Sequence, residues 1–206
     1  MTHASQYAIV IDEKSHQLPF TDVPQGSWYE EDVRYAYVRD IMEGTGAATF
    51  SPKNFMTRAM VAQILYNLEG EPAVTGAASF ADSSAHWAKT AIAWAQSNGV
   101  VNGYEDGAFH PNRFVTRQEL AQMLYNYAEY NGCDLTAAGS LSAFPDGDET
   151  APWAAEAFAW AVGQGFLTGF EDNTVQPLGT ATRAQAASIL VRFHQNLAEH
   201  GTKKAK

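Results

Sequence analysis

The sequence has a single cysteine, Cys133, among its 206 residues, so the chain cannot form an internal disulfide bond. A fold without disulfides needs no oxidising compartment, although such a compartment is not excluded. The stability of the fold must therefore come from packing. A hydrophobic content of 46% allows a substantial core, in one large domain or in a few small ones.

Long hydrophobic runs are also missing. The apolar run near the N-terminus, YAIVI at 7–11, is too short for the core of a signal peptide, and no stretch is long enough to span a bilayer. The sequence therefore predicts no membrane insertion. Met1 opens either a cytosolic protein or a piece excised from a longer one that has lost its signal peptide.

Basic residues are scarce, with 13 lysines and arginines against 23 acidic residues, which gives a net charge of -10 and a pI near 4.9. Such a field repels polyanions at long range, which argues against nonspecific binding to nucleic acids or to anionic membranes. Any anionic ligand of this protein must therefore be captured by a local site.

Three copies of one unit follow one another in the sequence. Each copy has a tryptophan and, 30 residues later, an arginine; a glycine follows the tryptophan by 16 residues and a proline precedes the arginine by 6. Four landmarks at fixed spacing in three copies identify an internal repeat. The landmarks are Trp28, Gly44, Pro52 and Arg58; Trp87, Gly103, Pro111 and Arg117; and Trp153, Gly169, Pro177 and Arg183.

A phenylalanine two residues before an aspartate precedes each tryptophan, in FTD at 20–22, FAD at 80–82 and FPD at 144–146. These motifs and the linkers between copies set the expected boundaries. We expect an N-terminal extension that could hold a strand of a preceding module, three repeats and a C-terminal tail. Their ranges are 1–18 for the extension, 19–72, 79–132 and 143–198 for the repeats, and 199–206 for the tail.

Each unit is predicted to be a helix, a loop and a second helix. The alanine-rich stretch 87–98 ends at Gly99, which predicts a helix with a glycine stop, and its counterparts are 28–42 and 153–164. A loop rich in Gly, Asp-Gly and Pro follows and could hold a short strand or hairpin. The second helix has an amphipathic stripe, as in Leu120, Met123, Leu124 and Tyr127. The pattern predicts a mainly α fold.

A Thr-Arg pair opens each second helix, in MTR at 56–58, VTR at 115–117 and ATR at 181–183. Threonine at an N-cap with Glu or Gln three residues later is typical of a capping box. Thr116 with Glu119 and Thr182 with Gln185 fit this box, whereas Thr57 provides only the cap.

The arginine is not explained by capping, because a cation in the first turn opposes the helix dipole. Two roles remain open on physical grounds. One is a salt bridge to a nearby carboxylate such as Asp22, Asp82 or Asp146. The other is a bidentate contact with the carboxylate of an external ligand, supported by the helix N-terminus.

In its order of motifs the chain resembles the S-layer homology (SLH) family. The matching elements are F-x-D, then W, then a loop of the GYxDGxFxP type, then a TRAE-like motif. The second copy matches strongly (GYEDGAFHPN, VTRQE), the third well (GFEDNTVQP, ATRAQ) and the first more loosely (EGTGAATFSP, TRAM). The resemblance covers about residues 19–197.

The resemblance implies a bacterial cell-wall anchor, secreted and located in the cell wall or S-layer. It implies three helix-loop-helix repeats in a pseudo-threefold arrangement around a central helical bundle, with grooves between neighbouring copies. Such triplets bind secondary cell-wall polysaccharide, usually through ketal-linked pyruvate on a terminal amino sugar. The motif arginines, which face the pyruvate carboxylate, are by position Arg58, Arg117 and Arg183.

The other landmarks are candidate ligand-binding residues with structural alternatives. Trp28, Trp87 and Trp153 could stack on a sugar face, although a tryptophan that opens a helix beside a core more often serves packing. The landmark glycines favour turn geometry, although a glycine also lets the backbone approach a ligand. They are Gly44, Gly103 and Gly169.

No catalytic site, metal site or cofactor is predicted. The histidines do not recur in register between copies, and no zinc-helix motif, nucleophile elbow or phosphate loop is present. The acidic run at 146–149 lacks the spacing of a calcium loop. We expect a noncatalytic carbohydrate-binding module that is monomeric in isolation. The alternative is a protein–protein assembly module of a surface layer, in which the arginines form structural bridges.

Overall fold

The computed structural model describes residues 18–136 and 138–200. Within these residues the regular structure is helical, and pairing of β type is limited to isolated bridges, which confirms the predicted mainly α class. No helix of the described part is long and apolar enough to cross a membrane. The strand suggested for the N-terminal extension lies outside the described residues, apart from Leu18.

The first helix of each repeat is shorter than predicted and begins after the tryptophan. These helices are α1 (Glu30–Val38), α3 (Lys89–Ser97) and α5 (Ala155–Gly163). None of the three has a side-chain cap at its N-terminus. The tryptophan therefore stands outside the helix it was expected to open. Gly99 follows α3 with a φ of 72°, as predicted for a glycine stop.

The second helix of each repeat begins directly after its threonine. These helices are α2 (Arg58–Leu68), α4 (Arg117–Tyr130) and α6 (Arg183–His200). Thr116 and Glu119 form the predicted capping box, Thr182 and Gln185 exchange the equivalent bonds, and Thr57 provides a cap alone. All three predicted caps are confirmed.

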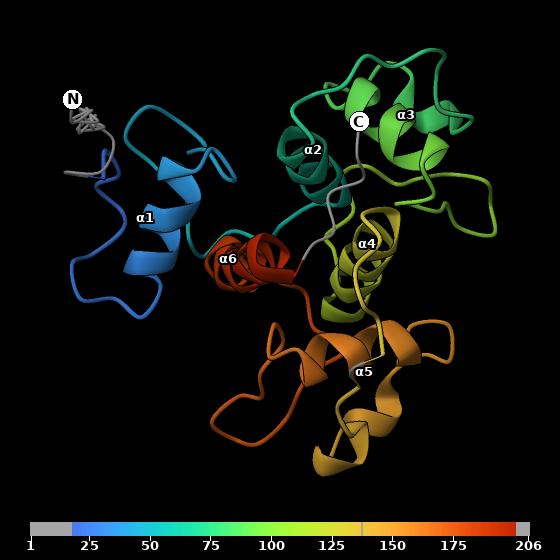
Figure 1. Cartoon of the computed structure of the whole chain (residues 1–206). Coiled ribbons are helices and arrows are strands. Elements are labelled where there is room, and N and C mark those ends of the chain that lie inside the picture. The colour runs from blue at the N-terminus through green and yellow to red at the C-terminus, as the bar shows by residue number, and fades with distance from the viewer. Residues whose placement is uncertain (1–17, 137, 201–206) are drawn as a thin grey trace, which may run out of the picture.

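The repeats pack in a cyclic order, because the second helix of each repeat contacts the first helix of the next. α2 packs on α3, α4 packs on α5, and α6 returns to pack on α1. Figure 1 shows α2, α4 and α6 in the middle of the molecule, with α1, α3 and α5 outside them. The apolar stripe of each amphipathic helix is thus covered by the neighbouring repeat.

Three backbone hydrogen bonds join the repeats at their centre. Met56 N donates to Ala181 O at 2.9 Å, Ala181 N donates to Val115 O at 3.1 Å, and Val115 N donates to Met56 O at 2.9 Å. All three residues are buried, so these bonds form in a site without competing water. They close the chain into a ring of repeats. The pseudo-threefold symmetry of that ring stays a prediction, since the contacts establish the cyclic order alone.

The F-x-D motif fixes the loop between the two helices of its own repeat. In the second repeat, Asp82 accepts the backbone amides of Phe109 at 3.1 Å and His110 at 2.7 Å. His110 has a φ of 54°, which is unfavourable for a residue with a side chain, and the carboxylate stabilises this turn. Asp22 and Asp146 make the same pair of bonds in the other two repeats.

Candidate ligand-binding groove

The arginine that opens each second helix is buried and crosses into the loop of the next repeat. The exposed fractions of Arg58, Arg117 and Arg183 are 6%, 4% and 6%. Arg58 donates from Nε to Phe109 O and from Nη2 to Asn102 O, both at 2.9 Å. A planar guanidinium can make two such bonds at once, so the side chain clamps two points of one loop.

The other two arginines repeat this arrangement around the ring. Arg117 donates to Val175 O at 2.9 Å and to Thr168 O at 3.0 Å, in the loop of the third repeat. Arg183 donates to Phe50 O at 2.7 Å and to Glu43 O at 2.6 Å, in the loop of the first repeat. The arginine and the loop that it contacts therefore always come from different repeats.

The arginines are held by backbone carbonyls, an interaction that the sequence did not predict. Asp22, Asp82 and Asp146 form no ion pair with the motif arginines among the described residues, because they accept backbone amides instead. Each guanidinium uses Nε and Nη2 for backbone carbonyls. The salt bridge proposed for these aspartates is thus replaced by a hydrogen-bonded clamp between repeats.

The helix N-termini are also occupied, which corrects the expectation that they help to capture an anion. In α2 the amide of Arg58 donates to Arg113 O and that of Ala59 donates to Pro111 O, both at 3.0 Å. The amide of Met60 is bound by the cap threonine. The first amides of α4 and α6 are satisfied by the neighbouring repeat in the same way. A ligand can therefore use the side chains of this region but not these amides.

The burial of the arginines affects their charge. Burial lowers the pKa of all three guanidinium groups, and that of Arg117 falls to about 10. Around Arg117, the nearby Asp146 raises the pKa and Arg192 lowers it. A pKa of about 10 leaves Arg117 positively charged at neutral pH. The site thus holds a desolvated cation, which attracts an anion more strongly than an exposed one does.

The three landmark tryptophans are exposed, so the packing role expected for them is wrong. Trp28, Trp87 and Trp153 have exposed fractions of 64%, 62% and 57%. A large aromatic ring that stays in water after folding is available to a ligand. The alternative from the sequence, stacking on a sugar, is compatible with this exposure.

The landmark glycines allow close contact with the phenylalanine of F-x-D and with their own loop. A Cβ atom on Gly103 would lie 2.5 Å from Cε1 of Phe80, and one on Gly44 would lie 2.6 Å from Cε1 of Phe20. Gly169 has the same relation to Phe144, at 2.9 Å. None of these glycines has a positive φ, but a Cβ would also lie 2.7 Å from Thr49 O at Gly44 and 2.9 Å from Ala108 O at Gly103, so the tightness of the loop itself calls for a glycine. The missing side chain lets an aromatic ring pack against the loop.

A groove of about 220 Å³ brings together one predicted site residue from each repeat. Trp28 comes from the first repeat, Arg117 from the second and Gly169 from the third. The remaining lining comes from the third-repeat loop and from α6. These residues are Phe166, Thr168, Phe170, Gln185, Ser188, Ile189 and Arg192. We name this cavity the Arg117 groove.

The loop carbonyls engage two of the three guanidinium nitrogens of Arg117. Its Nε and Nη2 are bound to carbonyls, whereas Nη1 has no hydrogen-bond partner among the described residues. The guanidinium carbon lies 4.7 Å from the centre of the Phe170 ring. The ring and the two carbonyls fix the plane of the guanidinium, so Nη1 is oriented before any ligand arrives.

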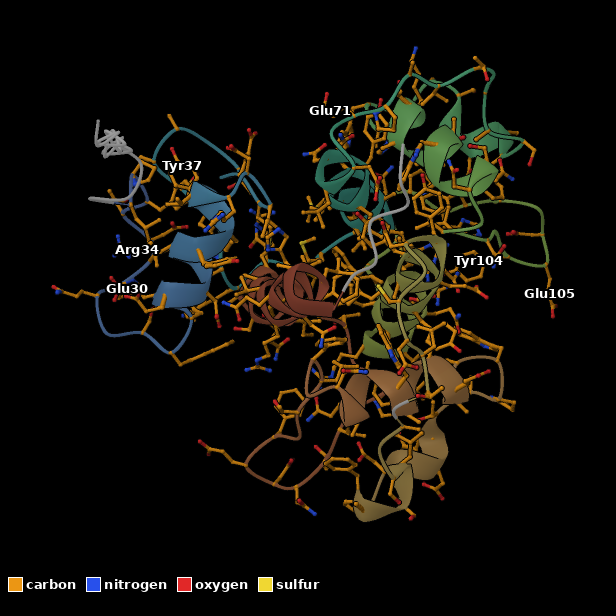
Figure 2. The ribbon with its side chains drawn as sticks, viewed as in Figure 1. Glu30, Arg34, Tyr37, Glu71, Tyr104 and Glu105 are labelled. Carbon is orange, nitrogen blue, oxygen red and sulfur yellow. The ribbon has the colours of Figure 1, made fainter. Side chains whose placement is uncertain are left out.

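The corresponding region around Arg58 is filled by side chains of the second repeat. The Tyr104 ring centre lies 4.7 Å from the guanidinium carbon of Arg58 and 4.8 Å from that of Arg113. Tyr104 also donates its hydroxyl to Glu119. In Figure 2, Tyr104 lies beside α4 and Glu105 extends outward at the tip of the same loop. Burial raises the pKa of Tyr104 to about 12, so the hydroxyl keeps its proton.

Sequence reasoning predicted Trp28, Arg117 and Gly169 as site residues of the groove and missed its other lining residues, among them Phe170 and Arg192. Phe170 occupies the second position of the GFED loop and could have been found from its alignment with Tyr104. Arg192 aligns with Asn126 and Asn67 in the other repeats, so no shared motif marks it. Its position on α6 becomes significant only through the neighbouring loop and Arg117.

Comparison with known proteins agrees with the repeat pattern. The model of the S-layer homology domain matches residues 19–60, 79–121 and 143–187. Among the similar proteins, an endoglucanase of Bacillus sp. (strain KSM-635) is 30% identical over 92% of this chain and 20% of its own length. A cellulosome-anchoring protein of Acetivibrio thermocellus is 27% identical over 87% of this chain and 39% of its own length.

An S-layer protein of Bacillus thuringiensis subsp. finitimus is 28% identical over the whole of this chain, which corresponds to 24% of that protein. The chain thus spans well under half the length of each of these relatives. Proteins of different kinds share the matched segment, as expected of a module of cell-surface proteins. With the model matched three times in succession, the chain belongs to the S-layer homology family, and its location is the secreted cell surface.

Proposed function

We propose that this chain is a noncatalytic anchor that binds secondary cell-wall polysaccharide, and that the Arg117 groove accepts a pyruvylated terminal amino sugar. The observation that carries the proposal is the meeting of Trp28, Arg117 and Gly169 in one groove. Arg117 supplies a cation, Trp28 an exposed aromatic ring and Gly169 a residue without a side chain. Together they match the carboxylate, the sugar face and the edge of such a ligand.

The groove provides two kinds of recognition at once. Nη1 of Arg117 can donate to a carboxylate in a charge-assisted hydrogen bond, whose contribution is about 1.5 to 3 kcal/mol. Trp28, from the first repeat, contributes a flat apolar surface. Because the three components belong to three repeats, the groove is complete only when the ring of repeats is closed.

The anchoring role also draws on the relatives. One of them is named a cellulosome-anchoring protein, and others are named S-layer proteins. Two relatives named as enzymes, the endoglucanase and an amylopullulanase of Thermoanaerobacterium thermosulfurigenes, match this chain over only 20% and 10% of their own length. Their catalytic activity therefore gives no reason to expect catalysis here, and an anchoring function fits all of these proteins.

Pull-down on purified cell wall tests the proposal. Wild-type protein should sediment with untreated wall, and mild acid that removes the pyruvate ketals should abolish the interaction. Trp28→Ala should weaken retention about fivefold, equivalent to about 1 kcal/mol. Phe114→Ala provides the control, because Phe114 is also an exposed aromatic residue but does not line the groove. Retention that survives removal of pyruvate contradicts the proposal.

A second function is favoured by one other observation. Phe55 and Phe114 are exposed and pack on each other with ring centres 5.3 Å apart, and Leu178 is exposed as well. Exposed apolar residues of this kind are typical of protein–protein contacts. The chain would then be an assembly module. Light scattering that shows oligomers growing with protein concentration and unaffected by sugar would support this function over the anchor.

A further inference from the structure

The charge of the Arg117 groove differs from that of the region around Arg58. Arg117 and Arg192 both line the groove, and none of the acidic side chains that the structure describes lines it. Asp146 lies near Arg117, but its carboxylate accepts hydrogen bonds from two backbone amides. Asp32, on α1 of the first repeat, accepts a hydrogen bond from the hydroxyl of Ser188 in the third repeat. The cavity itself therefore presents two positive charges.

Around Arg58, a carboxylate of the chain itself already lies near the guanidinium groups. Glu119 Oε1 lies 4.0 Å from Nη1 of Arg58 and 3.8 Å from Nη2 of Arg113. Its other oxygen accepts the amide and the hydroxyl of Thr116, at 2.8 and 2.9 Å. These bonds lower the pKa of Glu119 against the opposing effect of burial, so the group is an anion at neutral pH.

The identity of one capping residue produces this difference. Glu119 stands three positions after Thr116, and Gln185 stands three positions after Thr182. Both side chains accept the backbone amide of their threonine, at 2.8 and 3.0 Å. The cap is therefore made equally by either residue, whereas only Glu119 brings a negative charge toward the arginine of the preceding repeat.

We propose that the three arginines are unequal as anion sites. Glu119 acts as an internal carboxylate that fills the site at Arg58. Arg192 makes the Arg117 groove selective for a ligand with two negative charges. This inference rests on the proposed function and specifies its ligand. The second charge would belong to another acidic group near the terminal sugar, a carboxylate or a phosphate. A monoanion leaves one of the two guanidinium charges unmatched in the groove, whereas a dianion matches both.

The test uses the whole chain and two small probes, acetate and malonate, which differ by one negative charge. The Nε–H groups of the buried arginines can each be followed by nitrogen-edited NMR, because their hydrogen bonds slow exchange with water. We expect the Arg117 signal to shift at malonate concentrations about fivefold lower than the Arg58 signal. We expect Arg117 to prefer malonate over acetate by a similar factor.

Two reciprocal variants exchange the capping residues without removing the cap. Glu119→Gln should make the Arg58 signal respond to malonate, and Gln185→Glu should suppress the response of Arg117. Arg192→Gln should remove the preference of Arg117 for malonate over acetate while leaving its response to acetate. Thermal unfolding of each variant verifies that the fold is retained. The inference is overturned if all three arginines respond equally in the wild type, or if the exchange leaves their order unchanged.

A parallel titration with a pyruvylated amino sugar separates this inference from the proposed function. If the anions follow the expected order and the sugar causes no shift, the anchor proposal fails and the charge difference stands. If the sugar shifts all three arginines at equal concentration, the charge difference fails and the anchor proposal stands.

Discussion

The guanidinium of Arg183 donates a 2.7 Å hydrogen bond from Nε to the backbone carbonyl of Phe50, 133 residues earlier in the chain. Its Nη2 donates at 2.6 Å to the carbonyl of Glu43. Arg183 is buried, so both bonds are shielded from water. The last repeat thereby holds the loop of the first, and the ring of repeats depends on an arginine that the sequence pattern suggested for a ligand.

Replacing Arg183 with Ala should lower the free energy of unfolding by about 3 kcal/mol or more, because two bonds of a charged donor are lost at about 1.5 to 3 kcal/mol each. Arg183→Lys should recover only part of this loss, since an ammonium group cannot make the planar double contact. Equilibrium urea unfolding measures both effects.

Arg34 provides the control for this experiment. It is an arginine of α1 whose contacts are surface ion pairs with Glu30 at 2.9 Å and Glu31 at 3.8 Å, and Figure 2 shows Glu30 and Arg34 on the same helix. Arg34→Ala should cost about 0.5 kcal/mol or less. Equal losses for Arg183→Ala and Arg34→Ala would mean that the clamp contributes nothing beyond an exposed ion pair.

Gly103→Ala should destabilise the protein by about 1 to 3 kcal/mol, because the new Cβ would lie 2.5 Å from Cε1 of Phe80 and 2.9 Å from Ala108 O. Gly169→Ala should cost less, since its nearest contacts are 2.9 Å from Phe144 and 3.3 Å from Thr174 O. Thermal unfolding of the two variants gives their order. A larger loss for Gly169→Ala than for Gly103→Ala contradicts this account of the glycines.

Local structure was predictable from the sequence where a local interaction decides it. The cap threonines, the glutamate of the capping box and Gly99 each act within one turn, and the structure has all of them as expected. The starts of the first helices were wrong by about two residues, because Trp28 and its equivalents suit a helix on propensity but have no cap to begin one.

The contacts between repeats were not predictable in this way. Arg58 follows the loosely matching first loop in the sequence, yet it lies against the loop of the second repeat, whereas the first loop is held by Arg183. Periodicity shows that three units exist but does not show which loop each arginine contacts. The burial of the arginines and the role of Arg192 depend on this pairing, so they required the structure.

Acidification should weaken the contact between α1 and α6 through His194. Its Nδ1 lies 3.2 Å from the Tyr35 hydroxyl of α1, and burial, followed by the nearby Arg39, lowers its pKa below 6.5. Between pH 6.5 and the lower pKa, the unfolded chain binds more protons than the folded one, so stability falls as the pH falls.

The measurement is the melting temperature at pH 7.5 and at pH 5.5, for the wild type and for His194→Gln. The variant should show a smaller decrease between the two values, because the group with the lowered pKa is gone while the carboxylates are unchanged. An identical decrease in both proteins would exclude His194 as the source of this part of the pH dependence.

The most direct test of the anchor is calorimetric titration of the whole chain with a pyruvylated amino sugar and with the same sugar after removal of the ketal. The account predicts a heat of binding for the pyruvylated sugar, a smaller affinity for Trp28→Ala, and no measurable binding of the sugar that lacks pyruvate. Equal binding of both sugars, or no heat from either, would contradict a carboxylate-recognising groove at Arg117.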